Sequence, residues 1–399
     1  MSSIACRSCG SVKLTIFFNL GKMPLAGGFL SSLEEATSEP LFPLEVYVCE
    51  DCGLVQITEV VDPDIMFQGY SFSSSTIPPL VKHFEDYAQW LQDYLRPTSV
   101  LEFGCNDGVL LGPLANLGIQ SLGVDPSGNI SELGRSRGHR IVTGYFGKKL
   151  ADVVLSEYGR FDLVTGSNVF PHNHNPGDIL EGAKTILNPR GFLCLEVMYA
   201  GDLLDSFQWD TLYHEHLTFY SLSSLSTLLQ RHGFSVVDAV SIPMHGGSLR
   251  VVATQAQSVP LRDSAKAILA LEKTKKITEP QTWINFGDFC QVKIKIAKEV
   301  YAALAKTKRL WAYGAAGKAT MWVNACGMDY LEAVVDASPL RAGKLMPGTH
   351  TPIVPPDAMK KNPPDHVFIS AWNYAEHIKA KESWFGGIWS VPLPDLRFF

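Results

Sequence analysis

The chain has 399 residues, of which 46% are apolar, and a formal net charge of −6 at pH 7. Its length exceeds the size at which one hydrophobic core usually stops growing, so we expect two or three domains. The acidic balance and the lack of long runs of like charge argue against a nucleic-acid-binding surface. Neither a leader segment nor a stretch of about 18 uncharged apolar residues is visible, which predicts a cytoplasmic protein without membrane spans.

Two cysteine pairs mark the first segment, which we predict to be a zinc-binding domain over residues 1–75. The pairs lie in the runs CRSCG and CEDCG and comprise Cys6, Cys9, Cys49 and Cys52. Two thiolates separated by two residues bind one side of a tetrahedral ion, and a second pair completes a closed structural zinc site. A redox pair would need a thioredoxin-like unit around one CxxC, and four unrelated buried cysteines are the other alternative.

The next segment, residues 76–258, has the pattern of a methyltransferase core. A helix over residues 79–94 precedes an apolar strand at 100–103 and the turn E-x-G-x-x-x-G, which contains Glu102, Gly104 and Gly108. A second strand ends at Asp125, whose carboxylate can accept both hydroxyls of a ribose. This turn lacks the G-x-G-x-x-G of dinucleotide binders, and S-adenosylmethionine has no pyrophosphate to hold. The alternative is an ordinary strand, turn and helix with chance glycines.

Further apolar runs complete a doubly wound sheet. FDLVTGSNVF and GFLCLEV continue the α/β alternation, and GFSVVDAVSI and SLRVVATQ are joined by a short MHGG turn that predicts a hairpin. Five parallel strands followed by an antiparallel hairpin are expected of a class I methyltransferase sheet, which binds its ligand beyond the carboxyl ends of the strands. The predicted S-adenosylmethionine contacts are Glu102, Gly104, Asn106, Gly108, Asp125, Pro126, Gly144, Phe146, Ser167 and Asn168.

Three polar segments contain the candidate catalytic residues: SNVFPHNHN, DTLYHEHLTFYS and QGYSFSSS. The HEH run differs from the H-E-x-x-H pattern of zinc hydrolases, so we do not expect a catalytic metal. Histidine, with an ordinary pKa of about 6.5, suits the proton transfer that C-methylation requires. A structural role stays open for each histidine taken singly.

The last part of the chain predicts a helical linker and a second α/β domain. Residues 259–306 are amphipathic and charged on one face, as expected of two helices. Residues 307–399 begin with a strand, a G-x-x-G turn at Gly314–Gly317, a helix and a strand that ends at Asp336, which is the pattern of a smaller Rossmann-like unit. Independent NAD binding by this unit is an alternative.

The chain resembles the nucleotide-sugar C-methyltransferases of deoxysugar biosynthesis, which place a methyl group on C3 of TDP-4-keto-hexoses. The matching blocks span essentially the whole chain: CRSCG with CEDCGLVQ, YSFSSS, LEFGCNDGVLL, GVDPS, NVFPH, YHEHLTFYSL, HGGSLR, YGAAGKA, VVDASPLRAGKLMPGTHTPI and ISAWNYAEHI. The resemblance implies an α/β class I methyltransferase flanked by a zinc-binding domain and a C-terminal Rossmann-like domain that holds the nucleotide sugar. We expect a monomer or weak homodimer.

The resemblance further implies roles for individual residues. By position within YHEH the base is His216, supported by Tyr213 and Glu215, while His172 and Tyr70 lie near the sugar. The candidate contacts to the nucleotide sugar are Lys318, Lys344, His350, Trp372 and Asn373. Pro171 and Phe72 depart from the family pattern. The alternatives are an O- or N-methyltransferase on another small molecule, and a zinc-knuckle binding module that keeps a degenerate methyltransferase fold.

Overall fold

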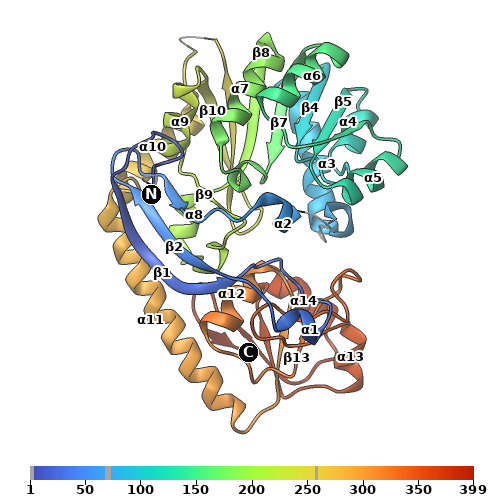
Figure 1. The fold of residues 1–399 in the computed structure, drawn as a ribbon, viewed down its shortest axis with the longest axis vertical. Coiled ribbons are helices and arrows are strands. Elements are labelled where there is room, and N and C mark those ends of the chain that lie inside the picture. The colour runs from blue at the N-terminus through green and yellow to red at the C-terminus, as the bar shows by residue number, and fades with distance from the viewer. Residues whose placement is uncertain (1–3, 68–72, 257–258) are drawn as a thin grey trace.

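The computed structural model describes residues 4–67, 73–256 and 259–399, which form three β-sheets and the helices around them. Figure 1 shows two lobes, with the methyltransferase sheet in the upper one and the C-terminal sheet in the lower one. The long helix α11 (Pro280–Ala305) and the strand pair β1–β2 (Leu14–Pro24 and Leu41–Cys49) run along one side of both lobes. The N-terminal segment therefore contacts the lower lobe as well as the upper one.

The upper lobe contains a seven-stranded sheet of order β10-β11-β8-β7-β4-β5-β6. Its strands are β4 (Ser99–Phe103), β5 (Gln120–Asp125), β6 (Ile141–Thr143), β7 (Phe161–Ser167), β8 (Leu187–Met198), β10 (Ser235–Ile242) and β11 (Ser248–Thr254). The five strands from β8 to β6 are parallel, and β11 is antiparallel to both β8 and β10. The predicted class I methyltransferase sheet and its closing hairpin are confirmed.

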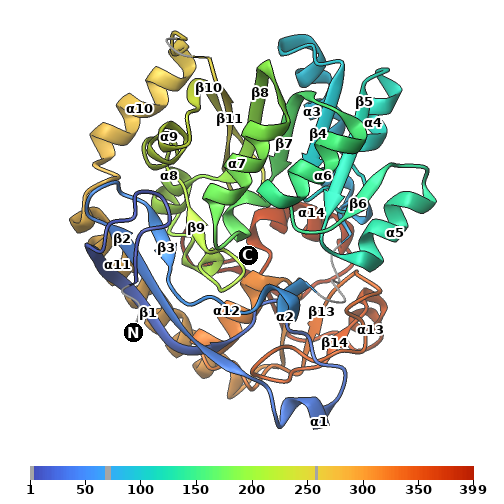
Figure 2. The same cartoon turned by 45° about the horizontal axis from the view of Figure 1, so that its top comes forward.

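Helices cover both faces of this sheet, and Figure 2 shows α6 and α7 lying in front of its central strands. They are α3 (Pro78–Tyr94), α4 (Leu111–Asn116), α5 (Gly128–Ser136), α6 (Lys148–Tyr158), α7 (Pro176–Ile186), α8 (Ala200–Asp205) and α9 (Leu222–Arg231). Helix α3 follows the predicted range, since its buried residues Leu80, Phe84, Tyr87 and Leu91 recur at helical spacing. Proline at its first turn fits the fixed φ of a helix start.

The N-terminal sheet has the order β1-β2-β3-β9 and is antiparallel throughout. Strand β3 (Val55–Ile57) follows the second cysteine pair, and β9 is the two-residue strand Thr218–Phe219 from the middle of the upper lobe. In this pairing Gln56 lies opposite Thr218. The segment that directly follows His216 is therefore a strand of the N-terminal sheet. Two short helices, α1 (Leu33–Ala36) and α2 (Pro63–Phe67), complete this region.

One hydrophobic core joins the N-terminal strands, α11 and the lower lobe. The ring of Phe17 on β1 lies 5.4 Å from the ring of Trp283 on α11. Gly287 on α11 allows the close approach, because a Cβ there would lie 1.9 Å from the carbonyl oxygen of Phe17. The predicted helices of residues 259–306 are α10 (Asp263–Lys275) and α11. Helix α11 thus packs as part of the core.

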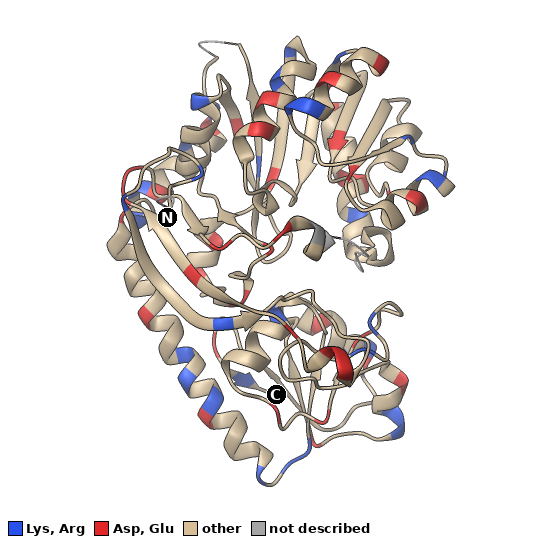
Figure 3. Cartoon of the chain, viewed as in Figure 1, with Lys and Arg blue, Asp and Glu red and all other residues tan. Residues whose placement is uncertain are grey.

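The lower lobe contains a six-stranded sheet of order β14-β13-β12-β15-β16-β17, parallel except for the last pair. Its elements are β12 (Leu310–Tyr313), α12 (Gly317–Ala325), β13 (Ala333–Val335), β14 (Ile353–Val354), α13 (Pro356–Lys361), β15 (His366–Ile369), α14 (Ala375–Lys381), β16 (Ile388–Val391) and β17 (Arg397–Phe398). The predicted strand, glycine turn and helix are confirmed. In Figure 3 acidic and basic residues are interspersed over both lobes. Among the described helices, none has the length and apolar character of a membrane span.

Candidate active site

The glycine turn after β4 lies against the end of β5. Gly104 has a φ of 67°, and a Cβ at this position would lie 2.4 Å from Cγ2 of Val169, so only glycine fits. The Gly104 N–H donates to the carbonyl oxygen of Val124 at 2.7 Å. The Asn106 N–H donates to Oδ2 of Asp125 at 2.9 Å. The turn thereby fixes the carboxylate that we predicted to accept a ribose.

Several buried polar atoms around this turn have no hydrogen-bond partner among the described residues: Oε2 of Glu102, Oδ1 of Asp107, Oγ of Ser167 and Oδ1 of Asn168. Burial, followed by the charge of Asp125, raises the pKa of Glu102 well above its ordinary value. Buried acceptors without donors are costly, and a ligand that brings N–H and O–H groups would satisfy them. S-adenosylmethionine brings an ammonium group, ribose hydroxyls and a positive sulfonium. The residues here fit it.

The other predicted cofactor contacts lie close to the same strand ends. The Gly144 N–H, after β6, donates to the backbone carbonyl of Asp125 at 2.9 Å. A Cβ at Gly108 would lie 2.5 Å from the ring of His139. The ring of Phe146 stacks on that of Phe103, with centroids 5.3 Å apart, so it belongs to the core beneath the turn. Pro126, directly after Asp125, is half-buried.

Asp107 connects the glycine turn to the segment that precedes α3. Its Oδ2 accepts hydrogen bonds from Oγ of Ser73 at 2.5 Å and from the Ser75 side chain, and it pairs with Arg137 at 3.0 Å. These donors hold the pKa of Asp107 below its ordinary value although burial opposes them. Tyr70, which the resemblance places near the sugar, lies outside the described residues, as does Phe72.

His216 lies at the centre of a histidine cluster at the carboxyl edge of the sheet. Its Nδ1 is 2.7 Å from the carbonyl oxygen of Thr211. A carbonyl only accepts, so Nδ1 carries the proton and Nε2 carries the lone pair. Burial, followed by the neighbouring positive charge of His172, lowers the pKa of His216 well below its ordinary value. The neutral ring is therefore the form present at neutral pH.

Two aromatic side chains surround this imidazole. The centroid of the His172 ring lies 4.9 Å away and that of the Tyr213 ring 4.0 Å away. Burial lowers the pKa of His172 to about 4. Gly317, at the start of α12, packs against the tyrosine, because a Cβ there would lie 2.9 Å from Cζ of Tyr213. The lower lobe thus contacts the cluster directly.

The remaining residues of YHEH hold the loop in place. Nε2 of His214 lies 3.1 Å from the carbonyl oxygen of Pro43, at the start of β2. Oε1 of Glu215 accepts from the Gly27 N–H at 2.7 Å, and burial raises the pKa of this carboxyl. Both residues therefore attach the His216 loop to the N-terminal segment. Pro171 supports the loop from the other side, because its carbonyl oxygen accepts from the Leu217 N–H at 2.9 Å.

The four cysteines come together as predicted. Their sulfur atoms all lie within 4.8 Å of one another, and Cys6 to Cys52 and Cys9 to Cys49 are each 3.5 Å apart. Tetrahedral zinc–sulfur bonds of about 2.3 Å imply sulfur separations of about 3.8 Å, so the set fits a structural zinc ion. Within the described ranges, no other cluster of histidine, cysteine or acidic residues has this geometry.

The zinc site also supports the His216 loop. Arg7 lies between the first two cysteines, and its Nη1 donates to the carbonyl oxygens of Ile57 at 2.5 Å and Leu217 at 3.4 Å. The Ile57 N–H donates to the same Leu217 carbonyl at 3.1 Å. Strand β3 and the residue after His216 are therefore held together beside the zinc ligands.

The predicted contacts to the nucleotide sugar divide into two groups. Lys318 and Trp372 lie beside the histidine cluster, with Nζ of Lys318 over the indole at 4.3 Å from the centroid. Asn373 follows Trp372 in the same 3₁₀ turn, Trp372–Tyr374. Lys344 is half-buried in the loop before β14, and no side-chain partner is described for it.

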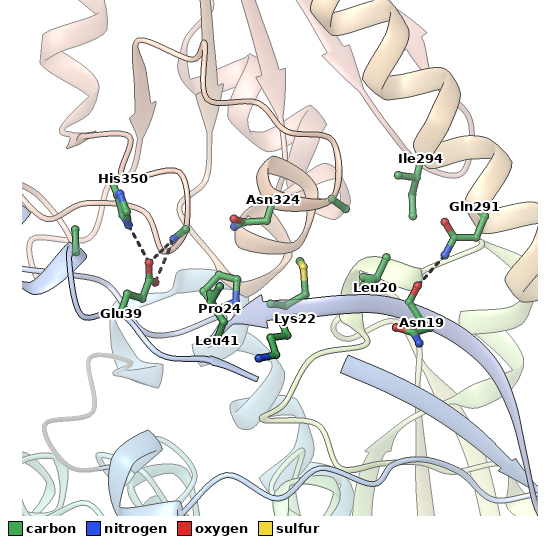
Figure 4. Close-up of a pocket in the computed structure, with 14 residues that line it drawn as sticks. Asn19, Leu20, Lys22, Pro24, Glu39, Leu41, Gln291, Ile294, Asn324 and His350 are labelled. Atoms are coloured by element: carbon green, nitrogen blue, oxygen red, sulfur yellow. Dashed lines mark hydrogen bonds and ion pairs between the residues drawn. The ribbon is translucent and has the colours of Figure 1, made fainter. Parts of the chain in front are cut away.

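His350 lies elsewhere. Its Nε2 is 2.9 Å from Oε2 of Glu39, in a cavity of about 540 Å³ that β1, α11 and the last turn of α12 also line. Figure 4 shows this pair together with Asn324. Asn324 follows Lys318 by six residues in α12, which is about 9 Å along the helix axis. The structure therefore does not bring His350 to the histidine cluster.

Two residues of this site, His245 and Asp210, were not predicted from the sequence. His245, in the turn between β10 and β11, has a φ of 54°, and burial, followed by the charge of Lys318, lowers its pKa to about 4. Because β10 runs in the same direction as the parallel strands, its following turn lies at the ligand edge. The HGG turn was therefore a usable signal. The other is Asp210, whose Oδ2 accepts from the indole N–H groups of Trp322 at 2.9 Å and Trp372 at 2.8 Å.

A buried ion pair lies behind the cofactor turn. Glu196 on β8 is fully buried, and its Oε1 accepts from Nε of Arg250 at 2.8 Å and from Nη2 at 2.7 Å. Its Oε2 lies 2.9 Å from Nε2 of His83 on α3. The backbone carbonyl of Glu196 accepts from the Asn168 N–H at 2.7 Å. The Glu196–Arg250 pair therefore helps to position β8, and β8 in turn holds Asn168, one of the predicted cofactor contacts.

Similar proteins and family models match nearly the full length of the chain. Three family models match: a zinc binding domain over residues 6–67, a methyltransferase domain over residues 81–239 and a C-methyltransferase C-terminal domain over residues 243–394. The C-methyltransferase NovU of Streptomyces niveus is 33% identical over 402 residues, which cover 98% of this chain and 96% of that protein. A ubiquinone biosynthesis O-methyltransferase of Azorhizobium caulinodans is 31% identical over 30% of this chain and 47% of its own. The solved CcbJ methyltransferase from Streptomyces caelestis, at 15% identity and a TM-score of 0.35, covers 43% of this chain and 89% of its own.

Proposed function

The chain belongs to the C-methyltransferase family of NovU, and we propose that it methylates C3 of a nucleotide-linked 4-keto-deoxysugar. It is an S-adenosylmethionine-dependent enzyme with a structural zinc site. The substrate and the enolate route described below are our proposals.

The observation that carries this proposal is the state of His216. Its Nδ1 is held by the carbonyl oxygen of Thr211, which leaves the lone pair on Nε2, and its imidazole is neutral because its pKa is lowered by burial. A neutral, buried and oriented imidazole is suited to removing a proton from carbon. An O-methyltransferase acting on an acidic hydroxyl does not require such a base.

The reaction follows from the acidity of a C–H group beside a carbonyl. Nε2 of His216 takes the C3 proton, and the electron pair of that bond is delocalised onto the O4 oxygen. When bound, S-adenosylmethionine supplies an electrophilic methyl group, which forms the new bond to C3. Tyr213 and Glu215 orient the His216 loop through their contacts with its ring and with Gly27. We assign His172 and Tyr70 to the sugar.

We propose that the lower lobe holds the nucleotide. Trp372 and Asn373 lie next to the cluster, and an aromatic face can stack on a base. Lys344 is our candidate for the diphosphate. His350 already contacts Glu39, so we propose that it could contact only the end of the nucleotide that is farthest from the sugar.

A panel of TDP-, GDP- and UDP-linked 4-keto-sugars, incubated with a labelled methyl donor, tests the proposal. We expect a product with a new carbon–carbon bond by NMR, and loss of deuterium placed at C3. A methylated oxygen or nitrogen with the C3 deuterium retained would favour the alternative methyltransferase. If calorimetry detected no binding of S-adenosylmethionine, the enzyme interpretation itself would fail in favour of a binding module.

A further inference from the structure

Lys318 is a buried cation at the start of α12. Its Nζ is buried and has no hydrogen-bond acceptor among the described residues. The indole of Trp372 covers it from one side at 4.3 Å. It is the second residue of a nine-residue helix whose N-terminus has no side-chain cap. Unpaired backbone N–H groups and the helix dipole add partial positive charge at this place.

The acidic residue beside this lysine is Asp210, whose pKa burial raises and the charge of Lys318 lowers. This residue is fully buried, and its Oδ2 accepts from two indole N–H groups, while its Oδ1 has no partner among the described residues. Burial lowers the pKa of Lys318, and the attraction of Asp210 opposes this shift. Asp210 and Lys318 together carry no net charge, and Nζ of Lys318 lacks a hydrogen-bond acceptor among the described residues. The site can therefore stabilise one further negative charge that forms transiently.

The lysine also belongs to the histidine cluster. The preceding residue, Gly317, packs on the ring of Tyr213, which in turn contacts His216 at 4.0 Å between centroids. Asp210 is the neighbour of Thr211, whose carbonyl oxygen holds Nδ1 of His216. Lys318 and His216 are therefore connected in two ways. Gly317, the residue before Lys318, packs on Tyr213, and Thr211, the residue after Asp210, holds the His216 ring.

We propose that Lys318 is a catalytic residue that binds the O4 oxygen of the enolate, rather than the diphosphate of the substrate. This inference rests on the proposed function. A resident diphosphate would bring about two negative charges next to buried Asp210, and one lysine would leave that excess uncompensated. An enolate brings one negative charge and only while the C3 proton is on His216.

The step balances as follows. The C3–H bond breaks, its proton moves to Nε2 of His216, and its electron pair becomes the C3–C4 double bond as the carbonyl pair moves to O4. The ammonium of Lys318 donates a hydrogen bond to O4 and neutralises its charge. C3 then gains the methyl group as the S–CH₃ bond of the donor breaks with its electron pair on sulfur, which leaves S-adenosylhomocysteine. The carbonyl re-forms, O4 loses its negative charge, and the proton on His216 is released to solvent before the next turnover.

Lys318 has a second effect on the base. Burial is the main cause of the lowered pKa of His216. Electrostatic interactions with His172, His245 and Lys318 add to it, while the hydrogen bond to Thr211 opposes it. Among the described residues, Tyr213 is the further ionisable side chain in ring contact with this imidazole. Removing the lysine charge should therefore move the acid limb of the pH–rate profile upward, which a purely structural role would not do.

The test measures the rate of hydrogen–deuterium exchange at C3 of a TDP-linked 4-keto-sugar in D₂O. S-adenosylhomocysteine replaces the methyl donor, so that no methyl transfer follows. Lys318→Met should slow exchange by about 100- to 1,000-fold, the usual loss for one oxyanion donor. It should also move the acid limb to higher pH and leave the Kd for TDP within about 3-fold, since that ligand contains no enolate. Lys318→Arg should restore the acid limb because the charge is kept.

Lys379 provides the matched control, because its Nζ lies over Phe399 at 3.8 Å in the same lobe. Lys379→Met should exchange at the wild-type rate. If Lys318→Met fails to fold, the double variant Lys318→Met with Asp210→Asn removes the unpaired buried charge and is tested in the same way. Two results would overturn the assignment of Lys318 to O4. One is wild-type exchange by Lys318→Met, and the other is weaker binding of TDP by this variant with an unchanged exchange rate. A wild-type enzyme that exchanges no 4-keto-sugar would instead contradict the proposed function.

Discussion

Two units of this protein share one local geometry and differ in what surrounds it. In the upper lobe β4, its turn and β5 end at Asp125, and in the lower lobe β12, its turn and β13 are followed by Asp336. Gly104 and Gly314 both have positive φ, and each donates its N–H to a carbonyl of the neighbouring strand at 2.7 Å. Each carboxylate accepts one N–H from the glycine turn and one from two residues further on.

The side chains around these carboxylates separate the two units. Asp336 also pairs with Nη1 of Arg341 at 3.3 Å, whereas Glu102, which is close enough to Asp125 for their charges to interact, has an Oε2 without a hydrogen-bond partner among the described residues. A cation therefore already occupies the acceptor that a ribose would need in the lower lobe, which argues against the NAD alternative. The shared fold places an aspartate after the second strand in both units, but the side chains around that aspartate determine whether a ribose can bind there.

The largest expected effect comes from replacing His216, the base that we propose. His216→Asn should lower turnover by about 1,000-fold, within the range of general bases. The Kd for S-adenosylmethionine should stay within about 3-fold, because the cofactor unit does not depend on this side chain. Calorimetry and a product assay on one preparation measure both. Normal methylation by this variant would refute the assignment of the base.

Zinc removal should have the next largest effect. Chelation releases β3, and with it β9 and the His216 loop, and a displacement of about 1 Å at a reacting group can cost about 100-fold in rate. We expect a loss of that order. The cofactor Kd should change much less, because the cluster that packs α3 and the glycine turn against the upper sheet contains none of the zinc-binding cysteines. Metal analysis and kinetics before and after zinc is restored check this result. Unchanged activity in the metal-free protein would exclude the supporting role.

The matched pair Asp125→Asn and Asp336→Asn tests the comparison directly. Loss of a charged hydrogen-bond acceptor costs about 1.5–3 kcal/mol, so Asp125→Asn should weaken S-adenosylmethionine binding by about 10- to 100-fold. Asp336→Asn should leave that Kd unchanged, because its carboxylate already faces Arg341. Equal effects in both variants, measured calorimetrically, would mean that the units are not functionally distinct.

The smallest effect concerns pH. Burial lowers the pKa of His216 well below its ordinary value, and the reactive form is the neutral one. Activity is therefore lost only as the pH falls through this lowered value, and kcat/KM should change by less than about 3-fold between pH 8 and pH 6.5. A pH–rate profile of the wild-type enzyme checks this. An acid limb centred near pH 6.5 would show that the imidazole is more exposed to water than the structure has it.

The parts of the site that the sequence predicted are those with a local pattern. Gly104 and Asp125 are recognisable because a turn that needs positive φ and a strand end determine their neighbours within a few residues. Strand β9 has only two residues, too short for any periodicity, so its pairing with β3 could not be predicted. The position of Lys318 beside Asp210 depends on how the lobes pack, which no local pattern encodes.

The carboxylate of Asp210 bears on how such enzymes can be recombined. It belongs to the upper lobe, yet both indoles that hold it, Trp322 and Trp372, come from the lower lobe. A chimaera that takes its lower lobe from a relative must therefore carry two tryptophans at these positions, or it leaves a buried charge without donors. Exchange of a whole lobe therefore has to preserve this contact between the lobes, whereas exchange of loops elsewhere leaves it intact.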